Sequence, residues 1–183
     1  MLTTFGSTCA RREAEKSASA AGAAVPTIEN DLATFRSGMT VQPRLLAGAP
    51  SQDSLVRLFE GALARRDTAG LDRLQITREE FAYLYYPDSK LSRPPYELDP
   101  QTMWTQIRSQ RDRGFRRLVA RYGGGKLRIR ALECGAPDYQ NAVVIHECGV
   151  RTNGTVDTTV KQLFGSIIER DGRFKFVGYA NRL

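Results

Sequence analysis

The chain has 183 residues, of which 41% are hydrophobic and 26% are charged, a balance that predicts one globular domain with a tail. It contains no apolar run near the roughly 20 residues that a transmembrane helix needs, and its single histidine and 3 cysteines leave little material for a metal site. The net charge of +7 favours acidic partners or anionic surfaces without identifying them. We predict no metal and no cofactor.

The first 50 residues are predicted to form a disordered tail or tether. The low-complexity stretch "SASAAGAA" cannot bury enough apolar surface to offset the entropy lost on ordering. The stretch that follows it has scattered apolar residues without a sustained period, so we expect only brief docking onto the domain. The docking side chains would be Leu32, Phe35, Leu45 and Leu46.

The opening residues resemble the end of a bacterial lipoprotein signal. In such a signal, small residues precede a cysteine that becomes the lipidated N-terminus, and Gly6-Ser7-Thr8 precede Cys9. The resemblance implies an exported protein of the bacterial cell envelope or periplasm, anchored by lipid on Cys9, with Met1 as an internal start. The alternative is a cytoplasmic protein with three ordinary thiols.

Residues 51–183 are predicted to form a single domain that begins with a helix. From Ser51 to Asp67 the apolar residues recur at helical spacing, and Ser51 or Asp53 can cap the helix. The buried stripe would comprise Leu55, Leu58, Phe59, Ala62 and Leu63. The segment "TAGLDRLQ" is expected to be a short turn.

The second helix has a clear predicted start. Thr77 and Glu80 stand in capping-box spacing, Ile76 and Phe81 in the spacing of a hydrophobic staple, and Pro87 ends the helix. The proline-stiffened segment "DSKLSRPPYE" follows as a loop, part of which could supply an early strand.

A third helix is predicted from Asp99, with Pro100 in its first position and a stop at the glycines of 123–125. Gly114 lies on its apolar face, where a missing side chain allows another backbone to approach closely. The other members of that face are Met103, Trp104, Ile107, Phe115, Leu118 and Tyr122.

After the glycines the hydrophobic period changes to that of strands, and four strand candidates follow: "KLRIRALEC", "NAVVIHECGV", "TTVKQLFGSIIE" and "RFKFVGYA". Asp171-Gly172 predicts a two-residue hairpin turn between the last two. Counting from that turn pairs Arg170 with Arg173, Ile167 with Phe176, Phe164 with Tyr179, and Gly165 with Gly178. Both faces of this hairpin carry apolar residues, so both are expected to be partly covered.

The helix "SLVRLFEGALARRDTAGLDRL" and the closing hairpin "LFGSIIERDGRFKFVGYA" resemble the nuclear-transport-factor-2-like superfamily, also called the cystatin-like α+β fold. The resemblance implies three helices packed on a curved antiparallel meander sheet, forming a cone with a pocket. The superfamily includes ketosteroid isomerases, polyketide cyclases and dehydratases, and many members that only bind or scaffold.

The candidate chemistry is sparse. His146, with Glu147 beside it, is the weak candidate for acid–base catalysis, because histidine titrates near neutral pH. Cys134 and Cys148 would form a disulfide if the hairpin between them centres near Asn141 and the compartment is oxidising. A metal site from the same cysteines and His146 is disfavoured, because the cysteines lie in expected strands rather than in zinc knuckles.

The sequence suggests two surfaces that could bind a ligand. An apolar pocket would be lined by Tyr85, Trp104, His146, Phe164 and Tyr179. Arginines also crowd the third helix, at positions 108, 111, 113, 116, 117 and 121, where they could contact anionic lipid or nucleic acid, although a solvated helix face is the simpler interpretation.

Three hypotheses remain open. The favoured one is an exported, lipid-anchored binding or scaffold domain, whose partner could be an apolar small molecule, an envelope protein or an anionic membrane surface. The alternatives are a small-molecule isomerase or cyclase and a basic nucleic-acid-binding protein. A homodimer is compatible with each of them.

Overall fold

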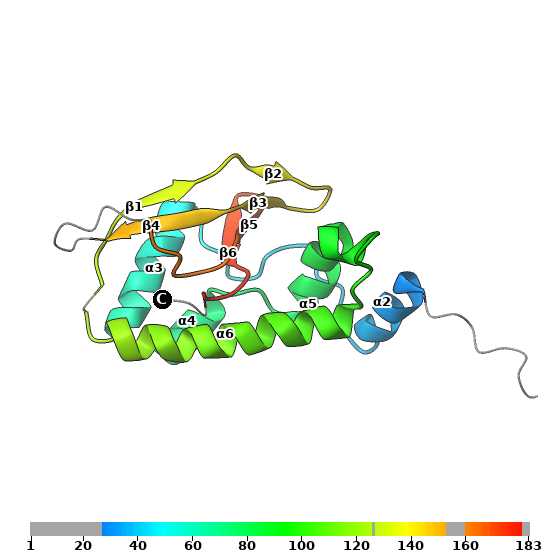
Figure 1. The fold of residues 1–183 in the computed structure, drawn as a ribbon, viewed down its shortest axis with the longest axis horizontal. Coiled ribbons are helices and arrows are strands. Elements are labelled where there is room, and N and C mark those ends of the chain that lie inside the picture. The colour runs from blue at the N-terminus through cyan, green and yellow to red at the C-terminus, as the bar shows by residue number, and fades with distance from the viewer. Residues whose placement is uncertain (1–26, 126, 153–159, 181–183) are drawn as a thin grey trace, which may run out of the picture.

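The computed structural model describes residues 27–125, 127–152 and 160–180, which form an α+β fold with antiparallel sheets. The α-helices in this part of the chain are α2 (Ile28–Arg36), α3 (Gln52–Ala64), α4 (Thr68–Arg73), α5 (Arg78–Glu80) and α6 (Pro100–Tyr122). A π-helical turn, Phe81–Tyr85, and two 3-10 turns, Tyr86–Asp88 and Lys90–Ser92, continue α5. The long helix α6 runs beneath the strands, with α3 and α4 toward one end and α5 and α2 toward the other (Figure 1).

The strands form two antiparallel sheets. One sheet has the order β2 (Asp138–Tyr139), β3 (Val144–His146), β5 (Ile167–Arg170) and β6 (Arg173–Phe176). The other pairs β1 (Ile129–Cys134) with β4 (Cys148–Thr152). The predicted register of the last hairpin is confirmed, from Arg170 opposite Arg173 to the isolated bridge between Phe164 and Tyr179.

The turn chemistry of that hairpin explains its register. Asp171 and Gly172 have φ angles of 49° and 67°, the left-handed conformations that a two-residue type I′ turn requires. Aspartate and glycine adopt such angles at low cost, so the pairing of every residue that follows is set locally.

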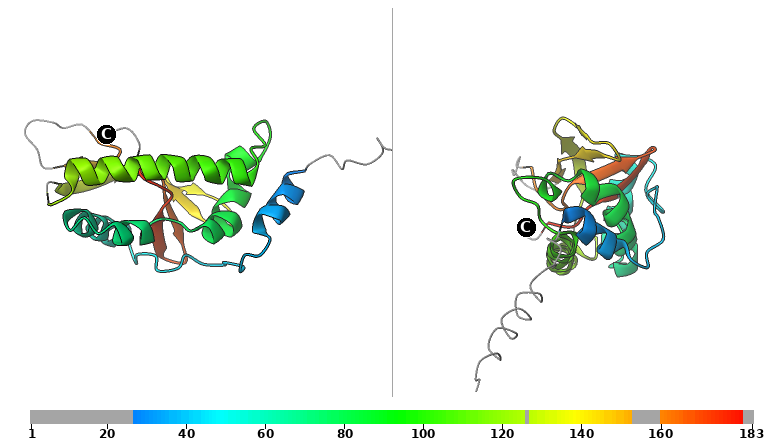
Figure 2. Two further views of the ribbon diagram at one scale, coloured as in Figure 1. Left: turned by 90° about the horizontal axis from the view of Figure 1, so that it is seen from below. Right: turned by 90° about the vertical axis from the view of Figure 1, so that its right-hand side faces the viewer.

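Two hydrophobic clusters lie on opposite faces of the β5–β6 hairpin. Ile167 and Phe176 pack with α3, α4 and the end of α6, whereas Ile168 and Val177 pack with α2, the π-helical turn after α5 and the start of α6. Because successive strand residues point to opposite faces, this hairpin is covered on both sides, as its sequence predicts. The two views in Figure 2 show helices on either side of the strands.

Three local expectations are confirmed. Ser51 caps α3, Thr77 and Glu80 form a complete capping box, and Asp99 caps α6 with Pro100 at its first position. Gly114 also makes the predicted close approach, since a Cβ placed there would lie 2.5 Å from the carbonyl oxygen of Ala180 and 2.6 Å from that of Tyr179.

Other expectations are corrected. Residues 28–50 are not a tether, because α2 forms, capped by Thr27. Of the expected docking side chains, Phe35 and Leu45 are buried in the second hydrophobic cluster, whereas Leu46 is 49% exposed. Ala49 pairs with Phe174 at the edge of β6. The segment 68–73 is a helix rather than a turn, because Asp67 accepts a hydrogen bond from Gly70 N and caps it. Leu58 faces outward from α3, and the loop after Pro87 contains a 3-10 turn rather than a strand.

Candidate functional site

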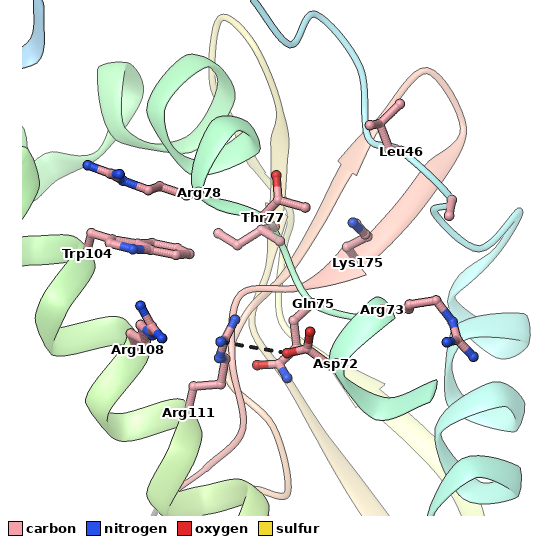
Figure 3. Close-up of a pocket in the computed structure, with 12 residues that line it drawn as sticks. Leu46, Asp72, Arg73, Gln75, Thr77, Arg78, Trp104, Arg108, Arg111 and Lys175 are labelled. Atoms are coloured by element: carbon pink, nitrogen blue, oxygen red, sulfur yellow. Dashed lines mark ion pairs between the residues drawn. The ribbon is translucent and has the colours of Figure 1, made fainter. Parts of the chain in front are cut away.

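A cleft of about 440 Å³ opens between α6 and the connection from α4 to α5. Figure 3 shows its walls: α6 supplies Trp104, Arg108 and Arg111, and the facing wall carries Asp72 and Gln75. Ile76 and Thr77 lie between these walls, and Leu46 and Ala47 approach from the segment before α3. The cleft therefore joins segments that are far apart in the sequence.

Five cationic side chains line this cleft, against one carboxylate. Two of the cations pair with carboxylates that do not line the cleft: Lys175 Nζ lies 2.8 Å from Glu80, and Arg73 lies 4.0 Å from Asp67. Arg78 stacks on the ring of Phe35, with its guanidinium carbon 4.5 Å from the ring centroid. In Figure 3 its head points away from the centre of the cleft.

The guanidinium groups of Arg108 and Arg111 carry the positive charge at the centre of the cleft. Arg108 is exposed and makes no ion pair with any residue in the described part of the chain. Arg111 lies 3.7 Å from Asp72 and 3.6 Å from Asp112, and both carboxylates are more than half exposed to solvent. Neither distance is short enough for a hydrogen bond, so both arginines have N–H groups that can bind an incoming oxyanion.

Gln75 lines the cleft beside these arginines. The residue is only 2% exposed, and its buried Oε1 has no hydrogen-bond partner among the described residues. Its backbone is fixed on both sides, by a hydrogen bond from Gln75 N to Asp72 O and by a bridge to Phe176. A buried polar atom without a partner is unfavourable, so Gln75 lowers the stability of the fold at this position.

The arginines of α6 stand out in the sequence, whereas Gln75 and Lys175 do not stand out there as cleft residues. A polar residue between Leu74 and Ile76, both of them buried, was a signal for Gln75. The position of Lys175 depends on the pairing of β6 with the region around residues 74–76, which local sequence does not encode.

The predicted apolar pocket does not form around one space. Trp104 lines the cationic cleft, whereas Tyr85 and Tyr179 line a second cleft of about 470 Å³ between α6 and the Gly165–Gly178 pairing. Phe164 is 1% exposed and belongs to the core, and His146 lines neither cleft. The five residues are dispersed because the two faces of the sheet pack against different helices.

The two tyrosines of the second cleft have raised pKa values, and a hydrogen bond also holds Tyr179 in place. Tyr179 donates its hydroxyl proton to the carbonyl oxygen of Leu71 at 2.6 Å, and burial raises the pKa of its phenol well above the ordinary value. Burial and, to a lesser extent, the charge of Glu147 also raise the pKa of Tyr85. Both phenols therefore remain protonated at neutral pH.

His146 has a carboxylate partner, although not the one expected. Its Nε2 lies 2.9 Å from Oε2 of Glu169, which is brought there by the pairing of β3 with β5. Glu147 points elsewhere and accepts a hydrogen bond from the Ser166 hydroxyl. The His146–Glu169 pair is partly buried and lies outside the clefts described above.

Cys134 and Cys148 face each other across β1 and β4, with their sulfur atoms 2.08 Å apart. This is the pairing that the sequence predicts for an oxidised protein. The pairing of β1 with β4 is centred on residue 141 where the cysteines meet. The pairing of β2 with β3 is displaced from this register by one residue. The turn between β2 and β3 is therefore centred close to Asn141, where the cysteine pairing requires it.

Cys9, the proposed lipidation site, lies outside the described residues. Within the described ranges, none of the helices is long and apolar enough to cross a membrane. In those same ranges no three histidine, cysteine, aspartate or glutamate side chains are grouped so as to hold a metal ion. Comparison of the chain with protein-family models, curated proteins and solved structures yields no match.

Proposed function

We propose that the chain is a small binding domain that holds an oxyanion-bearing molecule in the cleft between α6 and the α4–α5 connection. The observation that carries this proposal is the position of Arg108, whose guanidinium faces the cleft without an ion pair to any described residue. Arg111 lies beside it, held only by exposed carboxylates. Paired guanidinium groups recognise carboxylates and phosphates through directed, charge-assisted hydrogen bonds.

The charge of the cleft supports the same proposal. A concave surface lined by one sign of charge concentrates the field and attracts counter-ions. Arg108 and Arg111 project from one helix, three residues apart, so they lie on neighbouring positions of the same face. Gln75 and Trp104 extend the cleft with polar and apolar contacts.

A titration of the ¹⁵N-labelled protein with sodium acetate and with inorganic phosphate tests this function. We expect saturable chemical-shift changes at residues 75–78 and 104–111. Arg108→Gln should weaken binding about tenfold, as loss of a charge-assisted hydrogen bond predicts. The matched control is Arg117→Gln, on the same helix and outside the cleft, which should bind like the wild type. Equal effects of the two variants, or no saturable change, would contradict the proposal.

We further propose that this domain is exported and tethered through lipid on Cys9, and that its fold is a variant of the nuclear-transport-factor-2-like cone. The Cys134–Cys148 pairing supports an oxidising compartment. Helices that precede an antiparallel sheet, with Gly165 opposite Gly178, support the fold proposal. A non-reducing peptide mass map of the protein from its native host tests the location. Lipid mass on Cys9 with a linked Cys134–Cys148 peptide is expected, whereas three free thiols would refute export.

The enzymatic and nucleic-acid hypotheses have less support. The His146–Glu169 pair is a plausible acid–base unit by distance, but it lines neither the cationic cleft nor the tyrosine cleft. Arg116 and Arg117 are exposed on α6, and none of the exposed side chains of this helix is an aromatic ring on which a base could stack. Retention on heparin or DNA tests the nucleic-acid hypothesis. This hypothesis would be favoured if removing the charge of Arg108 left retention unchanged and removing the charges of Arg116 and Arg117 abolished it.

A further inference from the structure

We infer that the partner of the cationic cleft is an acidic peptide segment of another protein, which continues past Leu46 into a second arginine-lined cleft. This inference rests on the proposed function and specifies the kind of oxyanion-bearing molecule. The second cleft, here called the hairpin cleft, measures about 430 Å³ and is lined by residues 44–48 and the turn end of the β5–β6 hairpin. It shares Leu46 and Ala47 with the cationic cleft, so the two clefts adjoin.

The hairpin cleft carries three arginines against one carboxylate. Arg170 and Arg173 lie directly opposite each other at the end of β5 and β6, and Arg44 lines the same cleft from the segment before α3. The carboxylate is that of Asp171, which is 76% exposed and lies 3.6 Å from Nε of Arg170. Like charges directly opposite each other on paired strands are destabilising. An anion bound beside these arginines therefore relieves a repulsion that the fold contains.

Two of the three arginines have N–H groups available to a partner. Arg44 and Arg173 are exposed, and neither forms an ion pair with any residue in the described part of the chain. Arg173 donates one hydrogen bond of 3.5 Å to the carbonyl oxygen of Gly48, which is long for such a bond. Arg170 already donates to the carbonyl oxygen of Ala142. Carboxylates of the peptide therefore contact Arg44 and Arg173 in the hairpin cleft.

The strand β6 sets the spacing between the two clefts. Lys175 lines the cationic cleft and Arg173 lines the hairpin cleft, and both point to the same face because they are two residues apart. Two residues of a strand span about 7 Å. An extended peptide of five residues spans about 17 Å, so it has length to place one carboxylate near Arg108 and Arg111 and another near Arg44.

Leu46 distinguishes a peptide from other extended anions. Its side chain is 49% exposed and lies where the two clefts adjoin. In Figure 3, Leu46 and Lys175 lie on the side of the cationic cleft away from α6. An apolar side chain between two carboxylates of a peptide can cover Leu46, and the burial of apolar surface stabilises the complex. Polyphosphate has no apolar group to place there, and none of the residues lining the two clefts is an exposed aromatic ring on which a nucleic-acid base could stack.

Isothermal titration calorimetry on the full chain compares peptides with inorganic anions. The test peptide is acetyl-EELEE-amide, and its matched control, acetyl-EESEE-amide, has the same charge without the leucine. We expect the test peptide to bind at least tenfold more tightly than acetate or phosphate, and about threefold more tightly than the control peptide. Equal affinity of the two peptides, or tighter binding of tripolyphosphate, would overturn the peptide inference and leave the oxyanion function standing. Absence of binding by every probe, acetate and phosphate included, would refute both.

Substitutions in the hairpin cleft test the path of the peptide. The double variant Arg44→Gln with Arg173→Gln should weaken binding of the test peptide about tenfold, while acetate still shifts the signals of residues 104–111 as in the wild type. The matched control removes two charges outside these clefts, by Arg116→Gln with Arg117→Gln, and should bind the peptide like the wild type. Equal weakening by both double variants would show that net charge alone governs binding. Wild-type affinity of the hairpin variant would show that the peptide does not enter the hairpin cleft, and either result overturns the inference.

Discussion

Lys175 donates hydrogen bonds to both carboxylate oxygens of Glu80, with its Nζ 3.0 Å from Oε1 and 2.8 Å from Oε2. The lysine side chain is 3% exposed and the glutamate side chain is fully buried. The same carboxylate accepts hydrogen bonds from the backbone N–H groups of Leu46 and Thr77. Glu80 therefore joins β6, the segment before α3 and the start of α5 in one buried polar group.

Removing the positive charge from this pair should destabilise the protein strongly. Lys175→Met leaves the Glu80 carboxylate buried without its ion partner, and breaking such a pair costs about 3–5 kcal/mol. Urea unfolding followed by circular dichroism measures the change. The matched control is Lys90→Met, which breaks the solvent-exposed pair with Asp138 and should cost less than about 1 kcal/mol. Similar costs for the two variants would show that burial does not determine the strength of the Lys175–Glu80 pair.

Two glycine-to-alanine substitutions in helices should change stability with opposite signs. At Gly114 in α6, a new Cβ would meet the carbonyl oxygens of Tyr179 and Ala180, so the helix and the C-terminal segment must separate. We expect a loss of about 1–3 kcal/mol from this overpacking. At Gly61 in α3, the nearest atom is the flexible end of Arg65, at 3.3 Å. Gly61→Ala should therefore gain up to about 1 kcal/mol in helix propensity.

Thermal unfolding of both glycine variants distinguishes these effects. Gly114→Ala should lower Tm and Gly61→Ala should raise it or leave it unchanged. A raised Tm for Gly114→Ala would mean that the chain after β6 does not lie against α6 as the structure has it.

Reduction of the Cys134–Cys148 bond should lower the free energy of unfolding. The bond closes a loop with a sequence separation of 14, for which the chain-entropy model gives about 3 kcal/mol. Urea unfolding with and without dithiothreitol measures this difference. The double variant Cys134→Ser with Cys148→Ala provides the control, since its stability should not respond to dithiothreitol. An unchanged stability of the wild type under reduction would contradict the prediction.

Stability should fall above pH 10, and Tyr86 should contribute to this fall together with Tyr85 and Tyr179, whose pKa values are also raised. Burial, with smaller contributions from the charges of Asp99 and Asp31, raises the pKa of Tyr86 to about 12, and its hydroxyl donates a proton to Leu98 O at 2.8 Å. The unfolded chain loses this proton near pH 10, whereas the folded protein retains it, so the unfolded state binds fewer protons between these values. The contribution of Tyr86 to the free energy of unfolding is therefore complete below pH 10 and declines toward pH 12. The decline for this one group is at most about 1.4 kcal/mol per pH unit.

Urea unfolding at pH 9, 10 and 11 measures the slope. Tyr86→Phe should reduce the slope, although the variant also loses the hydrogen bond to Leu98. Tyr139→Phe, at a side chain 78% exposed, serves as the control and should keep the wild-type slope. If Tyr86→Phe retains the full slope, the decline has another origin.

Much of the secondary structure and the register of the β5–β6 hairpin could be predicted from the sequence, because they depend on residues close together in the chain. The capping box of Thr77 and Glu80, the start of α6 at Asp99-Pro100 and the turn at Asp171-Gly172 each satisfy local backbone groups or local φ requirements. Counting from that turn then places Ile167 opposite Phe176. The cleft was only partly predictable: the arginines of α6 were visible, but the wall that faces them was not.

Short-range spacing in the sequence was enough to predict where the long helix begins and ends, which residues pair in the last hairpin and which cysteines could meet. Tertiary contacts were needed to show that Phe35 and Leu45 are permanent members of the core, and that Glu80 is both a helix cap and the partner of Lys175. They were also needed to place Gln75 beside Arg108 and Arg111. Burial and charge pairing depend on which surfaces meet. Those surfaces come from segments as far apart as Glu80 and Lys175, which are separated by 95 positions in the chain.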